Sequence, residues 1–232
     1  MTTENWSPIN LAGRTFGFMW ETSPGTPWAA SSAYYMWQSL AVPLRSTSAI
    51  GAVDSAGSII GADLEAEYQL GAGRLLVGEY EVHDHESGRL LEVRTSAVWA
   101  DDEVGIWTDV GLRSDDWLLE FFEHIAPMNV SGYAVASGAK ATNWSEHAGQ
   151  LLLTIDGLGL FDLDADAIYD RPPDPGLSVR AGELFRDDSR PEHPAVVLVN
   201  DEVYGRLTHF EVSADDALAA LEQLVALTTS GR

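Results

Sequence analysis

Apolar residues that favour strands gather in four consecutive stretches in the middle of the chain. These stretches are rich in β-branched and aromatic residues, and short segments containing Gly or Asp separate them. Runs of this composition are typical of strands, and the separating segments are typical of turns. The pattern therefore predicts a β-meander with the strands Leu64–Leu70, Leu75–Val82, Leu90–Trp99 and Val104–Leu112.

The apolar spacing changes to that of a helix directly after the meander. Ser114 is a favourable N-cap, and Asp115 and Asp116 suit the positive end of a helix dipole. Pro127 then ends the helix. We therefore expect an amphipathic helix to close the first half of the chain.

The second half follows the same plan. We expect a terminal helix that begins at Ala214 and a rigid surface loop, Asp164–Gly176, which contains three prolines. The predicted strands and hairpin are near Tyr133–Ser137, Gln150–Ile155, Leu177–Phe185 and Val196–Val212.

The two halves can be overlaid without a gap at an offset of 99 residues. Asp102-Glu103-Val104 then falls on Asp201-Glu202-Val203, and the cap Ser114 falls on Ser213. Strand positions such as Val110 and His209 disagree, so the match fits either an internal duplication or two unrelated hairpin–helix pairs. The expected fold is α+β, mainly antiparallel sheet with two amphipathic helices in one compact domain. The two halves of this domain are residues 1–128, which are rich in aromatic residues, and residues 129–232. They are pseudo-repeats if the duplication is real.

The overlay exposes one difference between the helices. Trp117 and Phe121 extend the apolar arc of the first helix, whereas their counterparts are Asp216 and Ala220. Either the first helix is the more central one, or its two rings belong to a surface that binds a partner.

Aromatic residues also gather in the first 60 residues, which are rich in Gly, Ser and Pro. Ser23–Pro27 is typical of a turn, with extended segments at Thr15–Trp20 and Ser39–Arg45. Large amphipathic rings are frequent in binding sites, although they also fill cores. The candidate residues for a partner or ligand are Trp20, Trp28, Tyr34, Tyr35, Trp37, Trp117 and Phe121.

The charge of the chain narrows the class of partner. There are 36 acidic and 13 basic residues, a net charge of −23, which excludes nucleic-acid binding through a basic face and favours a basic protein partner. A saline environment also produces such acidity.

Cysteine is absent, which excludes disulfides and thiolate ligands. The sequence shows no signal-peptide pattern and no apolar run of about 20 residues, so we expect a cytoplasmic protein outside the membrane.

Two segments are weak candidates for metal binding. His83 and His85 share one face of a strand, as in a two-histidine metal pair, but a solvated turn is the simpler interpretation. A series of aspartates resembles the spacing of ligands in a calcium-binding loop. However, Ala167 stands where that loop requires Gly, and Pro173 stands where it requires a bidentate Glu. The residues of that series are Asp162, Asp164, Asp166 and Asp170.

No complete catalytic or nucleotide-binding motif is present in the sequence, and we expect no cofactor. The first hypothesis is a non-enzymatic inhibitor, immunity-type protein or chaperone-like factor, and the expected layout is similar to that of small secretion chaperones in architecture only. The second is a small-molecule binder or metal-assisted enzyme with a β-barrel-like pocket. The third is a structural component of a viral or cellular assembly from a high-salt, GC-rich source. The sequence leaves the oligomeric state open.

Overall fold

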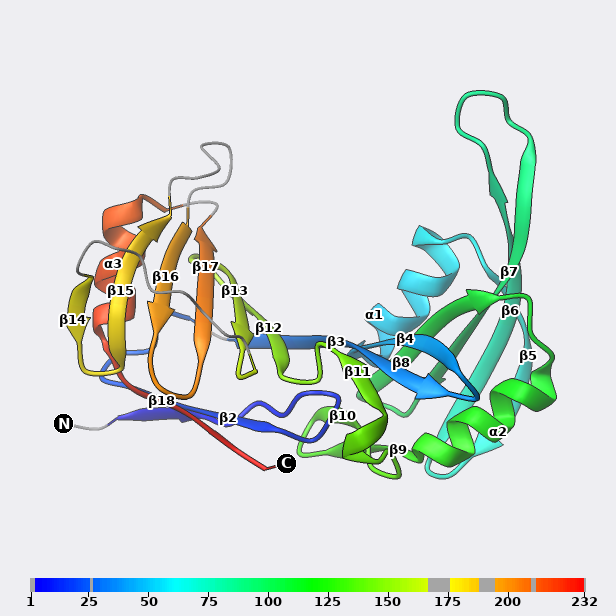
Figure 1. Cartoon of the computed structure of the whole chain (residues 1–232), viewed down its shortest axis with the longest axis horizontal. Helices are drawn as coiled ribbons and strands as arrows, with labels where there is room; N and C mark the ends of the chain where they lie inside the picture. Colours follow the sequence, from blue (N-terminus) through cyan, green and yellow to red (C-terminus); the bar gives the residue numbers. More distant parts are fainter. Residues whose placement is uncertain (1–2, 26, 167–175, 188–194, 210–211, 232) are drawn as a thin grey trace. The chain divides into compact units, whose positions relative to one another are not determined.

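Antiparallel strands make up most of the computed structural model, and the helices α1, α2 and α3 accompany them (Figure 1). The structure describes residues 3–25, 27–166, 176–187, 195–209 and 212–231. The chain forms two units with separate interiors. Unit 1 comprises Met1–Asn10, Arg14–Ala30 and Gly149–Arg232, and unit 2 comprises Leu11–Gly13 and Ser31–Ala148.

Unit 2 is built on an antiparallel sheet that begins with the later residues of β3 (Pro27–Trp37). The next strands across the sheet are β4 (Leu40–Ser48), β8 (Val104–Gly111), β7 (Leu90–Ala100), β6 (Gly73–His83) and β5 (Asp63–Leu70). A short strand, β11 (Trp144–Glu146), pairs with β3 on its other side, and the 3-10 turn η2 (Ala141–Asn143) precedes it. The strands β9 (Pro127–Val130) and β10 (Tyr133–Ala136) form a separate hairpin.

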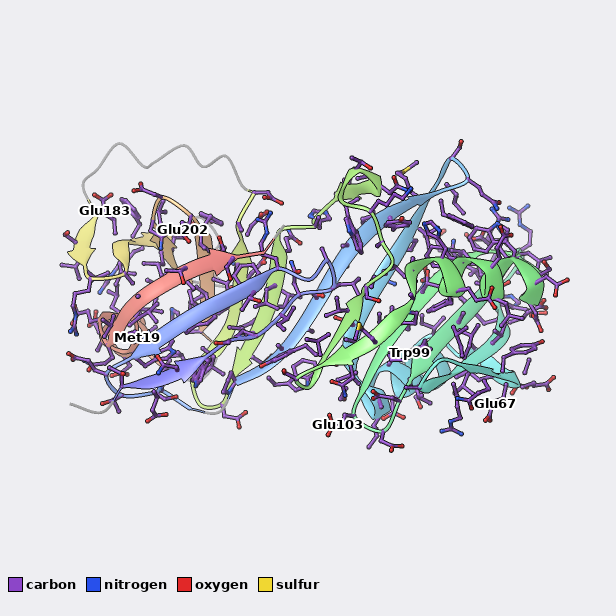
Figure 2. All side chains as sticks on the ribbon, turned by 90° about the horizontal axis from the view of Figure 1, so that it is seen from below. Met19, Glu67, Trp99, Glu103, Glu183 and Glu202 are labelled. Atoms are coloured by element: carbon purple, nitrogen blue, oxygen red, sulfur yellow. The ribbon has the colours of Figure 1, made fainter. Side chains whose placement is uncertain are left out.

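Helices cover both faces of this sheet. Ala97 and Trp99 of β7 pack in the core formed with α2 (Asp115–Ile125). The intervening Val98 and Ala100 pack with α1 (Ala49–Asp54), which continues into the π-helical turn η1 (Ser55–Ile59). Because side chains alternate between the faces of a strand, both sets are buried, which explains the continuous apolar run at the end of β7. Trp99 lies inside the unit, whereas Glu67 and Glu103 lie at its periphery (Figure 2).

Unit 1 contains a second antiparallel sheet, which includes residues 27–30 of β3. From there the strands are β12 (Gln150–Ile155), β13 (Gly159–Asp164), β17 (Tyr204–His209), β16 (Ala195–Val199), β15 (Gly182–Asp187) and β14 (Leu177–Val179). Its core also includes residues of α3 (Ala214–Glu222) and of a three-stranded sheet. The latter consists of β1 (Glu4–Trp6), β2 (Thr15–Trp20) and β18 (Leu224–Ser230).

The α+β class with antiparallel sheets is confirmed, as are the four meander strands and the helix capped by Ser114. Other details differ from the predictions. The helix α1 was not expected, because its sequence Ala-Ile-Gly-Ala-Val-Asp contains few strong helix formers. The predicted strand Leu177–Phe185 is two strands joined by a turn at Arg180 and Ala181. The last helix ends at Glu222, and β18 follows it, because Val225, Thr228 and Thr229 favour a strand.

The two units follow a different division from the predicted halves 1–128 and 129–232, since the N-terminal strands belong to unit 1. Most of the proline-rich loop Asp164–Gly176 lies outside the described residues. Within the described part of the chain, no helix is long and apolar enough to cross a membrane.

Candidate functional site

Six rings of unit 2 form a continuous series, which we call the aromatic array. Trp117 stacks on Phe121 with ring centres 5.6 Å apart, and Phe121 lies 6.1 Å from Trp37. Trp37 in turn lies 4.4 Å from the ring of His124. Tyr35 lies 5.9 Å from His124 and 5.2 Å from Trp144. The members come from β3, α2 and β11, so that elements distant in sequence build one site. The array comprises Tyr35, Trp37, Trp117, Phe121, His124 and Trp144.

The Tyr35 hydroxyl holds the buried end of the array in place. It lies 2.9 Å from Nε2 of His124, and it accepts hydrogen bonds from Nδ2 of Asn143 at 3.2 Å and from the Lys140 amide at 3.4 Å. A hydroxyl has one proton and two acceptor positions. With both acceptor positions used, Tyr35 donates its proton to His124 Nε2, which fixes the orientation of the imidazole.

Helical spacing places three members of the array on one side of α2. Trp117, Phe121 and His124 are four and three residues apart, so they lie along one flank of the helix. The Ser114 side chain accepts a hydrogen bond from the Trp117 amide and caps the helix. The Tyr68 hydroxyl of β5 donates to Asp115, and this hydrogen bond raises the pKa of Tyr68. The first turn of α2 is therefore anchored to the sheet.

Three indoles of the array are partly exposed: Trp37, Trp117 and Trp144. Nε1 of Trp117 donates to Oε1 of Gln38 at 3.0 Å, and the Arg113 guanidinium lies 5.4 Å from the centre of the Trp117 ring. Nε1 of Trp37 and of Trp144 is buried without a hydrogen-bond partner among the described residues. Indole faces, rather than indole N–H groups, are thus what this surface offers to a ligand.

The surroundings of the array are strongly acidic. The helix α2 carries the carboxylates Asp115, Asp116, Glu120 and Glu123 and has no Lys or Arg. Unit 2 as a whole contains 18 acidic and six basic side chains. A cation near α2 therefore meets both aromatic faces and a negative field.

The array contains four of the seven residues predicted from the sequence: Tyr35, Trp37, Trp117 and Phe121. The other three lie elsewhere. Trp20 is fully buried in the core of unit 1, Trp28 is 49% exposed on unit 1, and Tyr34 packs near His147. His124 and Trp144 were not predicted. His124 carried a signal, since it follows Phe121 at helical spacing, whereas Trp144 reaches the array only through the pairing of β11 with β3.

The weak metal candidates do not assemble into a cluster. His83 Nε2 lies 2.8 Å from Oε2 of Glu81, and His85 is exposed in the following turn. Arg14 forms an ion pair with Asp166 at 2.8 Å, while Asp170 lies outside the described residues. Among the residues that the structure describes, no three His, Asp or Glu side chains are grouped to hold a metal ion.

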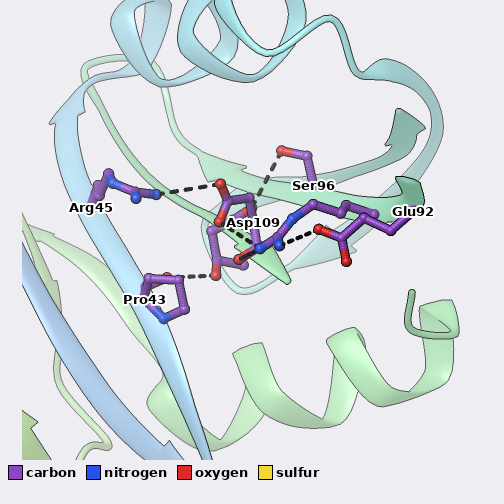
Figure 3. A network of polar contacts seen from close by, with 7 residues as sticks. Pro43, Arg45, Glu92, Ser96 and Asp109 are labelled. Carbon is purple, nitrogen blue, oxygen red and sulfur yellow. Dashed lines mark hydrogen bonds and ion pairs between the residues drawn. The ribbon is translucent and has the colours of Figure 1, made fainter. Parts of the chain in front are cut away.

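Apart from the aromatic array, a cluster of charged side chains lies on the α1-facing side of the unit 2 sheet (Figure 3). Asp109 lies between two arginines, 3.3 Å from Nη2 of Arg94 and 4.0 Å from Nη1 of Arg45. Arg94 also pairs with Glu92 at 2.9 Å, which raises the pKa of Arg94. Burial and the Asp109 charge raise the pKa of the nearby Tyr80 phenol. Two positive and two negative charges neutralise each other here, which is the arrangement of a structural ion network.

Comparison with known proteins gives no information about the function of these residues. No family model matches the chain, and searches of curated proteins and of solved structures gave no match.

Proposed function

We propose that this protein is a non-enzymatic binding protein that holds a basic segment of a protein partner on the aromatic array of unit 2. Inhibitor, immunity-type and chaperone-like roles all fit such binding. One observation carries the proposal: Trp37, Trp117 and Trp144 are partly exposed within one series of rings, beside a helix that has four carboxylates and no Lys or Arg.

The array and the charge of α2 are complementary to arginine or lysine side chains. An indole face attracts a cation by about 0.5–2 kcal/mol, depending on how far the cation is desolvated. Arg113 already makes such a contact with Trp117. The carboxylates of Glu120 and Glu123, both exposed on α2, add long-range attraction that speeds association and weakens with salt.

The array is ordered before a partner arrives. The Tyr35 hydroxyl fixes His124, Gln38 fixes Trp117, and Ser114 caps α2. Binding to pre-ordered rings costs little side-chain entropy, so a few cation contacts are enough for a measurable affinity.

The pseudo-repeat belongs to the same proposal. Six strands that follow one another in the chain are arranged in the same order in each unit's main sheet, 1-2-6-5-4-3 when they are numbered along the chain, and a helix follows the sixth strand. The series is β3 to β8 with α2 in unit 2, and β12 to β17 with α3 in unit 1. This shared order supports an ancestral duplication. Since Asp216 and Ala220 of α3 replace Trp117 and Phe121, we assign binding to unit 2 alone.

A labelled basic peptide tests the proposal directly. The probe is a short fluorescein-labelled peptide of alternating arginine and alanine with one central phenylalanine, and binding is measured by fluorescence anisotropy at low ionic strength. The double variant Trp37→Ala/Trp117→Ala is expected to bind about tenfold more weakly than the wild type. The matched control is Trp28→Ala, which removes an exposed tryptophan from unit 1 and leaves affinity unchanged.

A second pair of variants separates local from overall charge. Glu120→Gln/Glu123→Gln and Asp102→Asn/Glu222→Gln remove the same number of exposed carboxylates, but only the first pair lies on α2. Weaker peptide binding is expected for the first pair alone. Equal losses in both pairs, together with an unaffected Trp37/Trp117 variant, would show that the peptide responds only to net charge and would refute the proposal.

A further inference from the structure

An apolar pocket lies at the C-terminal end of α2, on the flank away from Trp117. Its volume is about 340 Å³, which accommodates one large side chain. The walls come from the β5–β6 turn, from the last turn of α2 and from the chain that follows it. The main lining residues are Leu70, Gly71, Phe122, Ala126, Met128 and Ser137.

Hydrogen bonds fix both sides of this pocket. On one side, Trp99 Nε1 donates to the Leu70 carbonyl at 3.1 Å, and Gln69 Nε2 donates to the Gly71 carbonyl at 3.1 Å. On the other side, Ala126 ends α2 in the left-handed conformation, and its carbonyl accepts the Ser137 hydroxyl at 2.6 Å. The walls are therefore set before any ligand enters.

The rim of the pocket is negative. Glu123 is exposed and contributes to the lining, and no Lys or Arg does so. The pocket also lies at the end of α2 where the helix dipole is negative, which favours a cation. An apolar interior below a negative rim is complementary to an apolar side chain that has a basic neighbour.

We infer that this pocket binds one apolar side chain, aromatic or aliphatic, of the same basic segment that occupies the aromatic array; the inference rests on the proposed function. Trp117 and the C-cap Ala126 are nine residues apart, which corresponds to about 13 Å along the helix axis, and crossing to the opposite flank adds about 17 Å around a helix about 11 Å wide. The path over the helix surface is therefore about 22 Å, which an extended segment covers with about six residues. The segment therefore carries its apolar anchor about six residues from an arginine or lysine that stacks on the array, and it crosses Glu120 and Glu123 between them.

The test compares two peptides that differ only at the anchor. One is the arginine–alanine probe with its central phenylalanine, and the other has alanine in that place. The wild type is expected to bind the phenylalanine peptide about tenfold more tightly, because the phenylalanine ring is removed from water when it enters the pocket. Ser137→Leu, which fills the pocket, is expected to abolish this preference. Ser178→Leu places the same side chain at an exposed position of unit 1 and is expected to retain it.

The outcomes distinguish the two proposals. Equal binding of both peptides by the wild type, with a Trp37/Trp117 effect still present, overturns the pocket inference and leaves the proposed function intact. No binding of either peptide overturns both. If circular dichroism shows that Ser137→Leu does not fold, Met128→Phe fills the mouth of the pocket from an exposed position and is expected to remove the preference in the same way. A preference that survives filling of the pocket also overturns the inference.

Discussion

Asp101 and Asn200 make the same pair of hydrogen bonds in turns that are 99 residues apart. Oδ1 of Asp101 accepts from the amides of Glu103 and Val104, both at 2.8 Å. Oδ1 of Asn200 accepts from the amides of Glu202 and Val203, also at 2.8 Å. Each turn joins the fifth and sixth strands of its sheet, and the offset is the one at which the helix caps Ser114 and Ser213 coincide.

The two turn residues are expected to respond differently to exchange of their side chains. Asp101→Asn keeps the Oδ1 acceptor and should change the free energy of unfolding by less than about 0.5 kcal/mol. Asn200→Asp should cost about 2–4 kcal/mol, because Nδ2 of Asn200 also donates to the carbonyls of Ala181 and Leu227, which repel a carboxylate. Urea unfolding of both variants measures the difference, and similar costs would contradict the assigned roles.

Gly73 and Gly182 also occupy matching positions, at the start of the fourth strand of each sheet. A Cβ atom on Gly73 would lie 2.6 Å from the Ala100 carbonyl oxygen, and one on Gly182 would lie 2.3 Å from that of Val199. We expect Gly73→Ala and Gly182→Ala each to lower the free energy of unfolding by about 1–3 kcal/mol. Gly111→Ala is the control, since that Cβ atom meets no neighbour within 4 Å. Equal stability of all three variants would contradict the close approach.

The meander and both helix caps could be predicted because local rules determine them. β5 alternates with a period of two, β6 to β8 are rich in β-branched and aromatic residues, and Ser114 and Ser213 precede acidic first turns. The strand β13 was missed because Gly159–Asp164 is short and acidic, and only its pairing with β12 and β17 makes it a strand. The boundary between the units could not be predicted from local patterns either, because β3 contributes residues to both units.

The candidate site could be predicted only in part, for a related reason. Trp117 and Phe121 stood out because helical spacing gives their direction relative to the apolar face. Trp20 and Trp37 both lie in strands rich in aromatic residues, and no local pattern distinguishes the buried ring from the partly exposed one. Their difference arises from tertiary packing, since Trp20 is sealed beside Phe18 and Trp6, whereas Trp37 lies against α2.

The hydrogen bond between His83 and Glu81 predicts a pH effect at the end of the β6–β7 hairpin. This bond, aided by the Gly88 carbonyl, raises the pKa of His83. The interaction is therefore fully present below the unfolded-state pKa and is lost as the pH rises through the folded-state pKa. Glu81→Gln should lower the titration midpoint of His83, which NMR of the imidazole signals measures. An unchanged titration midpoint of His83 would mean that the Glu81 carboxylate does not stabilise the protonated imidazole.

Asp109 is expected to matter more for stability than the neighbouring Glu92. The Asp109 side chain is 19% exposed between Arg45 and Arg94, whereas Glu92 is 48% exposed and pairs with Arg94 alone. Asp109→Ala leaves two partly buried guanidinium groups without their shared partner and should cost about 1–3 kcal/mol. Glu92→Ala should cost about 0–1 kcal/mol, as other exposed ion pairs do. Thermal unfolding compares the two, and a larger loss for Glu92→Ala would contradict the network as described.

Removal of the Tyr35 hydroxyl tests whether it organises the aromatic array. Tyr35→Phe keeps the ring but leaves His124 Nε2, Asn143 Nδ2 and the Lys140 amide without this partner. Unpaired buried polar groups cost about 1–3 kcal/mol, so we expect the free energy of unfolding to fall by that amount. Tyr34→Phe removes a hydroxyl from the adjacent, half-buried residue and should be close to neutral. Since Trp37 packs on His124, its fluorescence should change only in Tyr35→Phe. An unchanged Trp37 signal combined with the full loss of stability would mean that the hydroxyl supports the core without ordering the array.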